Sequence, residues 1–444
     1  MSVPADLVLT GGTVWTGAPR APFAEAVAVR SGRIVAVGTT AEVREQVGTA
    51  RHFVDLRGKA LLPGFQDAHC HPVSGGLQAR QCDMGGARTL ADCQAAVTRY
   101  LTAHPGAEWV SGGGWSMETF PGGTPPVAPL DAVCQGRPAF LVNRDGHSAW
   151  VSSLALELAG IDSATPDPPD GRIEREPDGR PQGTLHEGAM DLIERLVPAP
   201  DAEEIAAALE EAQTHLLSLG VTGWQDAMVD HEVQSAYESL ARGGKLRARA
   251  RLALWWERGP GLDQIGDLVA RREALAGLGL DAGTVKMMLD GVIENYTAAL
   301  LEPYLDGAPH GGCRHDLGDG KLFFEPELVE AAVPLLAREG FQLHFHAIGD
   351  RAVRLALDAV EHAGPERADL RHHVAHIQLV HPDDVGRFSR LGVAANAQPF
   401  WACAEPQMTE LTIPFLGEER SSWQYPFASL ARTGAVLAGG SDWP

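Results

Sequence analysis

The sequence predicts an α/β protein with a (β/α)8 TIM-like barrel, a small N-terminal β-sandwich domain and an insertion after the first barrel strand. From residue 201 onward, short apolar segments of β type alternate with helical patterns. Together with a strand at about 61–71 they give eight strands, most of them followed by a helical pattern, as in a closed parallel barrel. No Gly-x-Gly-x-x-Gly fingerprint follows the first strand, which disfavours an open, doubly wound sheet.

Composition narrows the class of protein. The 444 residues suit one large domain with additions, or two or three domains. A net charge of −22 disfavours nucleic acid and anionic membrane surfaces as partners. No run is long and apolar enough to span a bilayer, and the first residues lack the pattern of a secretory signal. The six scattered cysteines form no disulfide framework, so we expect a cytoplasmic protein.

Three regions follow one another along the chain. Residues 1–60 carry β-branched bursts separated by glycine turns, which predicts a small antiparallel sheet with a structural role. Residues 76–200 are irregular, with a helix expected at 89–104, and we interpret them as an insertion subdomain. The barrel then comprises residues 61–75 and 201–444.

Apolar periodicity places the barrel elements. After the strand at 61–71, the expected strands lie at 221–226, 248–255, 285–290, 341–346, 372–378, 393–398 and 436–442. Helical patterns lie at 201–220, 326–339, 351–362 and 382–391. Asp201 is a suitable N-cap for the first of these helices, and Gly220 ends it.

The motif His69-Cys70-His71 ends the first barrel strand. Strand side chains alternate with period two, so both imidazoles lie on one face and Cys70 points away from them, into the core. Pro72 then ends the strand. Two imidazoles at the C-terminal end of a strand can bind one metal ion, although many His-x-His pairs bind none.

Other residue types that bind metals stand at the expected ends of later strands, namely Lys286, His346, His376 and Asp442. In a barrel the C-terminal strand ends meet at one mouth, where active sites lie. A lone histidine at a strand end is more often a hydrogen-bonded core residue. Four histidines and an aspartate at one mouth predict a metal centre.

Lys286 allows two interpretations. It can be a partly buried lysine that pairs with Asp290 or another acid, which costs desolvation. Alternatively, its amine has reacted with carbon dioxide to form a carbamate that bridges two metals. The second interpretation replaces a buried cation by an anion among cations and so removes the electrostatic problem.

Six motifs, spread over nearly the whole chain, carry a family resemblance: Pro63–His71, Asp145–Trp150, Lys286–Gly291, His346–Ala352, His376–Gln378 and Gly440–Asp442. On these motifs the sequence resembles the metal-dependent amidohydrolase superfamily. Within it, the sequence looks like the YtcJ-like branch (amidohydrolase family 3), which includes formamide deformylase-like enzymes.

The resemblance implies a binuclear site. Its ligands would be His69 and His71 on the buried metal, His346 and His376 on the exposed metal, and an N6-carboxylated Lys286 between them. Asp442 would touch metal and act as the proton shuttle, and an unmodified Lys286 would imply one metal instead of two. Zinc is the default for a histidine-rich site, with iron, manganese and cobalt as alternatives.

Two features depart from the family pattern. Many relatives carry a glutamate where this chain has Ala375, so any role of that glutamate is in doubt here. Family members also continue past the final aspartate through a last barrel helix, whereas this chain stops at Pro444. We therefore expect a truncated C-terminal end.

These features predict a hydrolase that cleaves the carbon–nitrogen bond of a small non-peptide amide through a metal-activated hydroxide, with Asp442 as proton shuttle. His147, by resemblance, and Trp115 and Glu294 are expected in the substrate wall, with packing inside the insertion as the alternative for Trp115. Other readings are a cyclic-amide hydrolase on the same scaffold and a catalytically inactive metal-binding relative. Phosphoester cleavage is disfavoured, because no Arg/Lys cluster accompanies the metal motifs. The oligomeric state is open, a homodimer included.

Overall fold

The computed structural model describes residues 4–305, 318–364 and 369–444. His310, to which the sequence assigns no site role, and Cys313 lie outside the described residues. The chain divides into two compact units, Met1–Phe65 and Gln66–Pro444. No helix in the described ranges is both long enough and apolar enough to cross a membrane.

The N-terminal unit contains two small sheets. In the larger one the strand order is β5 (Arg33–Gly38), β4 (Ala26–Arg30), β1 (Ala5–Thr10), β6 (Ala50–Asp55), and the smaller one orders β3 (Phe23–Ala24), β2 (Thr13–Trp15), β7 (Ala60–Leu61). β1 pairs antiparallel with β4 but parallel with β6, so the prediction of a purely antiparallel sheet was wrong. The reason is helix α1 (Thr40–Val47), which returns the chain for a parallel strand and packs Val43 and Val47 into the small core.

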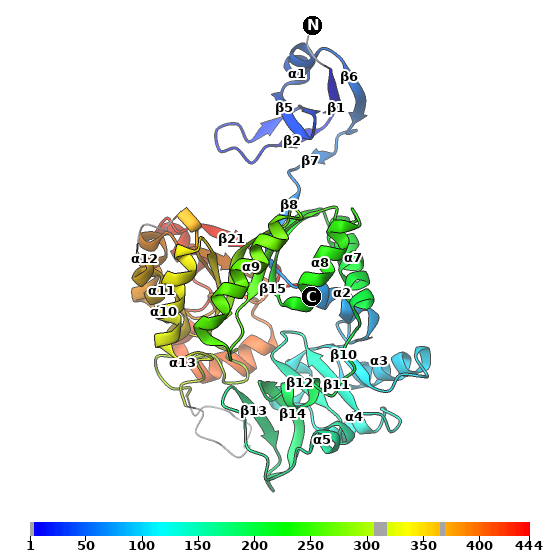
Figure 1. Cartoon of the computed structure of the whole chain (residues 1–444), viewed down its shortest axis with the longest axis vertical. Helices are drawn as coiled ribbons and strands as arrows, with labels where there is room; N and C mark the ends of the chain where they lie inside the picture. Colours follow the sequence, from blue (N-terminus) through cyan, green and yellow to red (C-terminus); the bar gives the residue numbers. More distant parts are fainter. Residues whose placement is uncertain (1–3, 306–317, 365–368) are drawn as a thin grey trace. The chain divides into compact units, whose positions relative to one another are not determined.

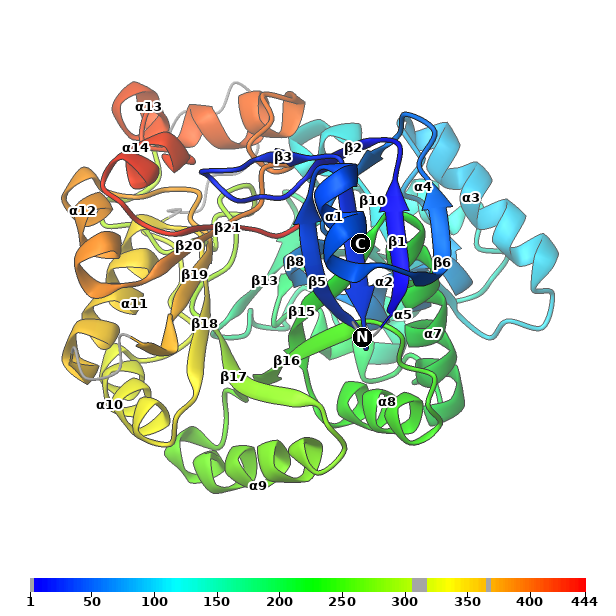
Figure 2. The ribbon, with the colours of Figure 1, turned by 90° about the horizontal axis from the view of Figure 1, so that it is seen from above.

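The second unit contains the predicted barrel, which the structure confirms (Figure 2). Its strands, in chain order and in neighbouring positions, are β8 (Phe65–Cys70), β15 (Val221–Val229), β16 (Arg249–Trp255), β17 (Asp281–Met288), β18 (Gln342–Ala347), β19 (His373–His376), β20 (Ala394–Ala397) and β21 (Leu437–Gly439). The segment after β21 completes the ring beside β8, because Asp442 N donates to His69 O at 2.8 Å and His71 N donates to Trp443 O at 2.7 Å.

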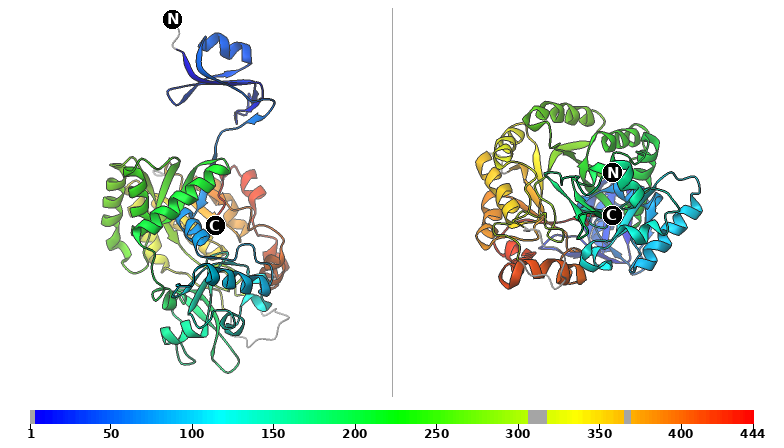
Figure 3. Two further views of the ribbon diagram at one scale, coloured as in Figure 1. Left: turned by 90° about the vertical axis from the view of Figure 1, so that its right-hand side faces the viewer. Right: turned by 90° about the horizontal axis from the view of Figure 1, so that it is seen from below.

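Helices surround the barrel, as Figure 3 shows from below. They are α2 (Pro72–Arg80), α7 (Ala202–Ser218), α8 (His231–Arg242), α9 (Ile265–Ala276), α10 (Pro326–Arg338), α11 (Asp350–Ala363), α12 (Pro382–Leu391) and α14 (Phe427–Arg432). The main core lies between the strands and these helices. On β18 the alternation is clear, since Leu343 and Phe345 join this core while His344 contacts His69 inside the barrel.

Residues between α2 and α7 form a second sheet within the same compact unit (Figure 1). Its strand order is β13 (Gly171–Arg175), β14 (Pro181–Glu187), β12 (Ser148–Val151), β11 (Ala139–Asn143), β10 (Val110–Trp115), β9 (Cys82–Asp83). Around it pack α3 (Leu90–Ala103), α4 (Val127–Asp131), α5 (Ser153–Ala159) and α6 (Asp191–Glu194). After β20 the chain forms a π-helical turn (Gln407–Thr412) and α13 (Ile413–Ser421) before α14.

Candidate functional site

Three of the predicted ligands converge where β8 and the segment after β21 meet. One donor atom each of His69, His71 and Asp442 lies within 4.8 Å of the others. Nε2 of His69 is 3.0 Å and Nε2 of His71 is 3.3 Å from Oδ1 of Asp442. Gly440 makes this approach possible, because a Cβ there would lie 2.6 Å from the Cβ of His69. Two imidazoles and a carboxylate around one point form a suitable ligand set for a divalent metal.

The orientation of His69 fits a metal ligand. Its Nδ1 lies 2.9 Å from Nε2 of His344, which fixes the ring from inside the barrel. Its Nε2 is buried and makes no hydrogen bond. Oδ1 of Asp442 is only 3.0 Å from this nitrogen, but the angles of the contact are not those of a hydrogen bond. A metal ion placed between two such donors would satisfy both, and a ring nitrogen fixed from behind is the usual arrangement of a metal-binding histidine.

Asp442 contacts more than the two imidazoles. Its Oδ2 accepts a hydrogen bond from the indole Nε1 of Trp401 at 2.8 Å, and it lies 3.7 Å from Nδ1 of His376. Burial alone would raise the pKa of this carboxyl, but the interactions with the neighbouring imidazoles of His69 and His376 outweigh burial and hold it well below its usual value. Asp442 is therefore a carboxylate at neutral pH.

His346 and His376 lie next to this group and line the same pocket. Their ring centroids are 4.4 Å apart, and the ring of His376 is 4.9 Å from that of His69. Nε2 of His346 lies 3.4 Å from the carbonyl oxygen of Gly291. Gln398 holds the strand end from behind, because its Oε1 accepts the backbone N–H of His376 at 2.7 Å.

Lys286 lies on β17 inside the barrel and is 3% exposed. Burial lowers its pKa to about 7, against the opposing effect of the carboxylates of Asp442 and Asp226. Asp290 accepts the backbone N–H groups of Ala299, Ile348 and Gly349, which gives its carboxylate a structural function in the loops above β17 and β18. A lysine with this pKa is substantially neutral near pH 7, which is the form that reacts with carbon dioxide.

A pocket of about 530 Å³, including the space at its open mouth, lies above these residues. His147 from the insertion and Glu294 from the loop after β17 both line it, and their contact with substrate stays a prediction. Burial lowers the pKa of His147, but the Glu187 carboxylate outweighs burial and raises it to about 9. Burial raises the pKa of Glu294, which accepts a hydrogen bond from Thr412 at 2.7 Å.

Trp115 does not line this pocket, which corrects its placement in the substrate wall. It is fully buried in the core of the insertion, and its indole donates to the carbonyl oxygen of Leu141 at 2.7 Å. The reason is that Trp115 is the last residue of β10, whose final three residues are all buried, so the strand carries its side chain into the core. Packing inside the insertion, the alternative reading of this tryptophan, describes it correctly.

Comparison with known proteins places this geometry in a family. The sequence matches the amidohydrolase family over residues 52–444. The chain belongs to the amidohydrolase family. As in the YtcJ-like branch that its motifs resemble, it is a metal-dependent amidohydrolase.

Relatives of this amidohydrolase cover nearly all of its chain. It is 32% identical to protein LONG AFTER FAR-RED 3 of Arabidopsis thaliana, over 99% of this chain and 75% of that protein. It is 29% identical to the putative amidohydrolase YtcJ of Bacillus subtilis, over 98% and 80% of the two chains. It is 27% identical to N-substituted formamide deformylase of Arthrobacter pascens, over 99% and 81%.

Solved structures share the fold of this amidohydrolase. A metal-dependent hydrolase from Pyrococcus furiosus superposes with a TM-score of 0.69 at 24% identity, over 98% of this chain and 85% of that one. A second one, from Pyrococcus horikoshii, gives 0.70 at 24% identity, over 98% and 82%.

The structure also places residues in the amidohydrolase site that sequence reasoning missed. Asp226 on β15 is 2% exposed, accepts a hydrogen bond from the hydroxyl of Tyr237 on α8 at 2.9 Å, and acts on Lys286 through its charge. An acidic residue near the end of an expected barrel strand could have been predicted as a site residue from the sequence. Glu187 and Trp401 left no such signal, because both lie in segments whose approach to the barrel mouth depends on tertiary folding.

Proposed function

We propose that this amidohydrolase cleaves the carbon–nitrogen bond of a small, non-peptide amide. The observation that carries the proposal is the group formed by His69, His71 and Asp442, which lies beside His346 and His376 at a pocket that Asp442 also lines. The name of the Arthrobacter pascens relative, N-substituted formamide deformylase, supports N-formyl and N-acyl amines as the first substrates to test.

The ligand set is proposed as follows. His69, His71 and Asp442 would hold one metal, His346 and His376 would hold a second, and Lys286, as a carbamate, would supply an anionic ligand to this pair. Zinc is the proposed metal because histidine nitrogen and carboxylate oxygen suit it. When bound, such a metal lowers the pKa of water and polarises a carbonyl oxygen.

Asp442 moves the proton. Its carboxylate lines the pocket and is ionised, so it can accept a proton from the attacking water. The same carboxyl then delivers the proton to the departing nitrogen, which is a poor leaving group unless protonated. One residue serves both steps, as amide hydrolysis requires.

His147 and Glu294 contact the substrate in this proposal. They stand on the pocket wall contributed by the insertion and by the loop after β17, respectively. An imidazole N–H suits the carbonyl oxygen of an amide, and a carboxylate suits the N–H of the amide or the amine that leaves. A cyclic amide would meet the same groups and is the alternative substrate class.

A catalytically inactive reading has one specific support. The chain is 29% identical to the exoenzymes regulatory protein AepA of Pectobacterium carotovorum, over 98% of this chain and 93% of that protein. The Asp442→Asn variant discriminates between the two hypotheses, because loss of turnover with metal retained requires a catalytic role of Asp442 beyond metal binding.

The deciding experiment uses the metal-loaded protein and a panel of N-formyl amines, N-acyl amines and cyclic amides. Hydrolysis is measured by the appearance of the amine product. In Asp442→Asn, turnover is expected to fall below detection while metal content stays near that of the wild type. Metal loss in this variant would identify Asp442 chiefly as a ligand. Absence of turnover across linear and cyclic amides would favour the inactive reading.

A further inference from the structure

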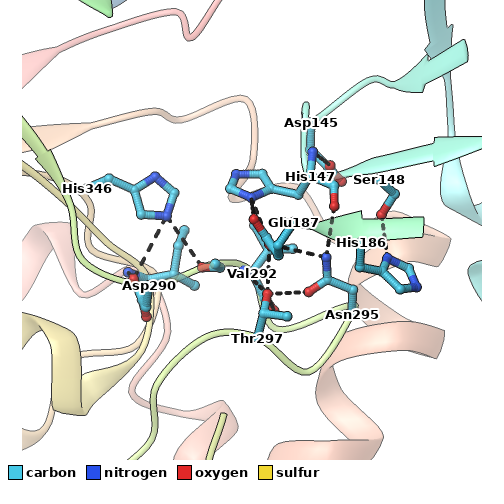
Figure 4. Close-up of polar contacts among 12 residues, drawn as sticks. Asp145, His147, Ser148, His186, Glu187, Asp290, Val292, Asn295, Thr297 and His346 are labelled. Atoms are coloured by element: carbon cyan, nitrogen blue, oxygen red, sulfur yellow. Dashed lines mark hydrogen bonds and ion pairs between the residues drawn. The ribbon is translucent and has the colours of Figure 1, made fainter. Parts of the chain in front are cut away.

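A buried carboxylate stands directly behind His147. Glu187, the last residue of β14, is 7% exposed, and its Oε1 and Oε2 lie 3.0 and 3.1 Å from Nδ1 of His147 (Figure 4). The ring of His147 stands beside that of His346, with centroids 5.3 Å apart. Nothing in the mechanism above assigns a role to Glu187.

The loop after β17 fixes Glu187 from the other side. Oγ1 of Thr297 lies 2.8 Å from Oε1 of Glu187, and Nδ2 of Asn295 donates to the same oxygen at 3.3 Å. Asn295 also donates to the carbonyl oxygen of His147 at 3.2 Å. The loop after β17 therefore makes hydrogen bonds to both Glu187 and His147.

Two backbone features show how closely this arrangement is determined. Glu187 has φ +51°, a conformation that residues other than glycine rarely adopt and that persists only where the surroundings impose it. Gly291 stands against the same carboxylate, and a Cβ there would collide with Glu187 and Thr297. The carboxylate thus occupies a space that the neighbouring loop leaves open for it.

The geometry of imidazole gives the consequence. The two ring nitrogens face nearly opposite directions, so a ring whose Nδ1 is held by Glu187 turns Nε2 away from it. Within the described part of the chain, the hydrogen bonds of the His147 ring all go to Nδ1. Since His147 lines the pocket, Nε2 is the atom left for a ligand.

We propose that Glu187 is a positioning residue, which holds the imidazole of His147 so that Nε2 contacts the scissile amide group of the substrate. The contact with substrate rests on the function proposed above. The orientation of the ring does not, because it follows from the protein contacts alone.

The first test is a crystal structure of metal-loaded Glu187→Ala. We expect the His147 ring to lose its single orientation and to turn toward other partners. Glu174→Gln is the control. Oε1 of Glu174 on β13 lies 3.0 Å from Nε2 of another histidine, His186, so this variant also removes a carboxylate from behind an imidazole. His186 does not line the pocket. An unchanged His147 ring in Glu187→Ala would overturn the proposal, whether or not the enzyme hydrolyses amides.

The second test is a double-mutant cycle on the best substrate of the amide panel. Glu187→Gln should lower kcat/KM by about 10- to 100-fold, the range found when the carboxylate behind a metal-binding histidine is removed. In a His147→Ala background the same substitution should cost almost nothing, because Glu187 acts through that ring. Equal losses in both backgrounds would overturn the proposal, and Glu174→Gln should leave kcat/KM unchanged. If no amide is turned over, the proposed function fails while the crystal structure still decides the role of Glu187.

Discussion

Trp401 donates its indole N–H to Oδ2 of Asp442 at 2.8 Å, while Oδ1 of the same carboxylate faces Nε2 of His69 at 3.0 Å. The two oxygens therefore have different nearest partners. Oδ1 faces His69 and His71, whereas Oδ2 is held by Trp401 and lies 3.7 Å from Nδ1 of His376. This division suits a carboxylate that both binds a metal and moves a proton.

Trp401→Phe keeps an aromatic ring but removes the donor to Asp442. A hydrogen bond to a charged group contributes about 1.5–3 kcal/mol, so kcat should fall by roughly 10- to 100-fold. Metal content should stay near the wild-type value, because Oδ1 keeps its position. Steady-state kinetics and elemental analysis on one preparation check this, with Trp423→Phe, outside the pocket lining, as the control. A variant that loses metal along with activity would contradict the division of labour between the two oxygens.

Gly291→Ala tests the packing behind His346 and His147. The new Cβ would collide with Thr297 and Glu187, and overpacking of this kind costs about 1–3 kcal/mol. We expect a lower Tm together with reduced activity. Gly386→Ala is the matched control, since a Cβ in that position of α12 meets nothing within 4 Å and alanine is the better helix former. Equal Tm values for the two variants would refute the crowding at Gly291.

Because of His372, we expect the free energy of unfolding to fall at low pH. Burial lowers its pKa from 6.5 to about 4, and its Nδ1 accepts the backbone N–H of Leu343 at 2.9 Å. Because the folded pKa lies below the unfolded value, the unfolded chain binds more protons between these values. The contribution of His372 to the free energy of unfolding is fully present above pH 6.5 and is lost as the pH falls toward 4. The loss amounts to at most about 3 kcal/mol.

Urea unfolding of the wild type and of His372→Gln at pH 7.5 and at pH 4.5 measures this contribution. The wild type should be the more stable protein at pH 7.5, and its advantage should shrink at pH 4.5. An advantage of the same size at both pH values would show that His372 does not titrate in this way.

The variant Lys286→Ala distinguishes between a carbamate and an ammonium group on the Lys286 side chain. If Lys286 supplies an anion between two metals, the variant should lose about half of a two-metal complement, and a small carboxylate such as acetate should restore part of it. If Lys286 is a cation paired with Asp226 or Asp442, acetate should have no effect. Metal content after dialysis, with and without acetate, distinguishes these outcomes.

Much of the barrel could be predicted from sequence because its signals are local. On β18 the alternation of Leu343 and Phe345 with His344 and His346 reveals both the core face and the site face. The rule that barrel sites lie at C-terminal strand ends then gathers His69 and Asp442, far apart in sequence, at one mouth.

The substrate wall could not be predicted in the same way. Glu187 reaches Thr297 across 110 residues, and only the packing of the insertion against the loop after β17 brings them together. Trp115 belongs to no motif that indicates a site, and its position in the core of the insertion follows only from the folded β10. Trp401 lies beyond the end of β20, where periodicity gives no information on side-chain direction.

Metal content per purified chain, measured by elemental analysis, tests the central claim most directly. We expect one or two equivalents of a divalent metal in the wild type, with two if Lys286 is carboxylated, and a clear loss in the double variant His69→Ala/His71→Ala. A folded wild-type protein without metal, or a double variant that keeps its full complement, would contradict the metal centre described here.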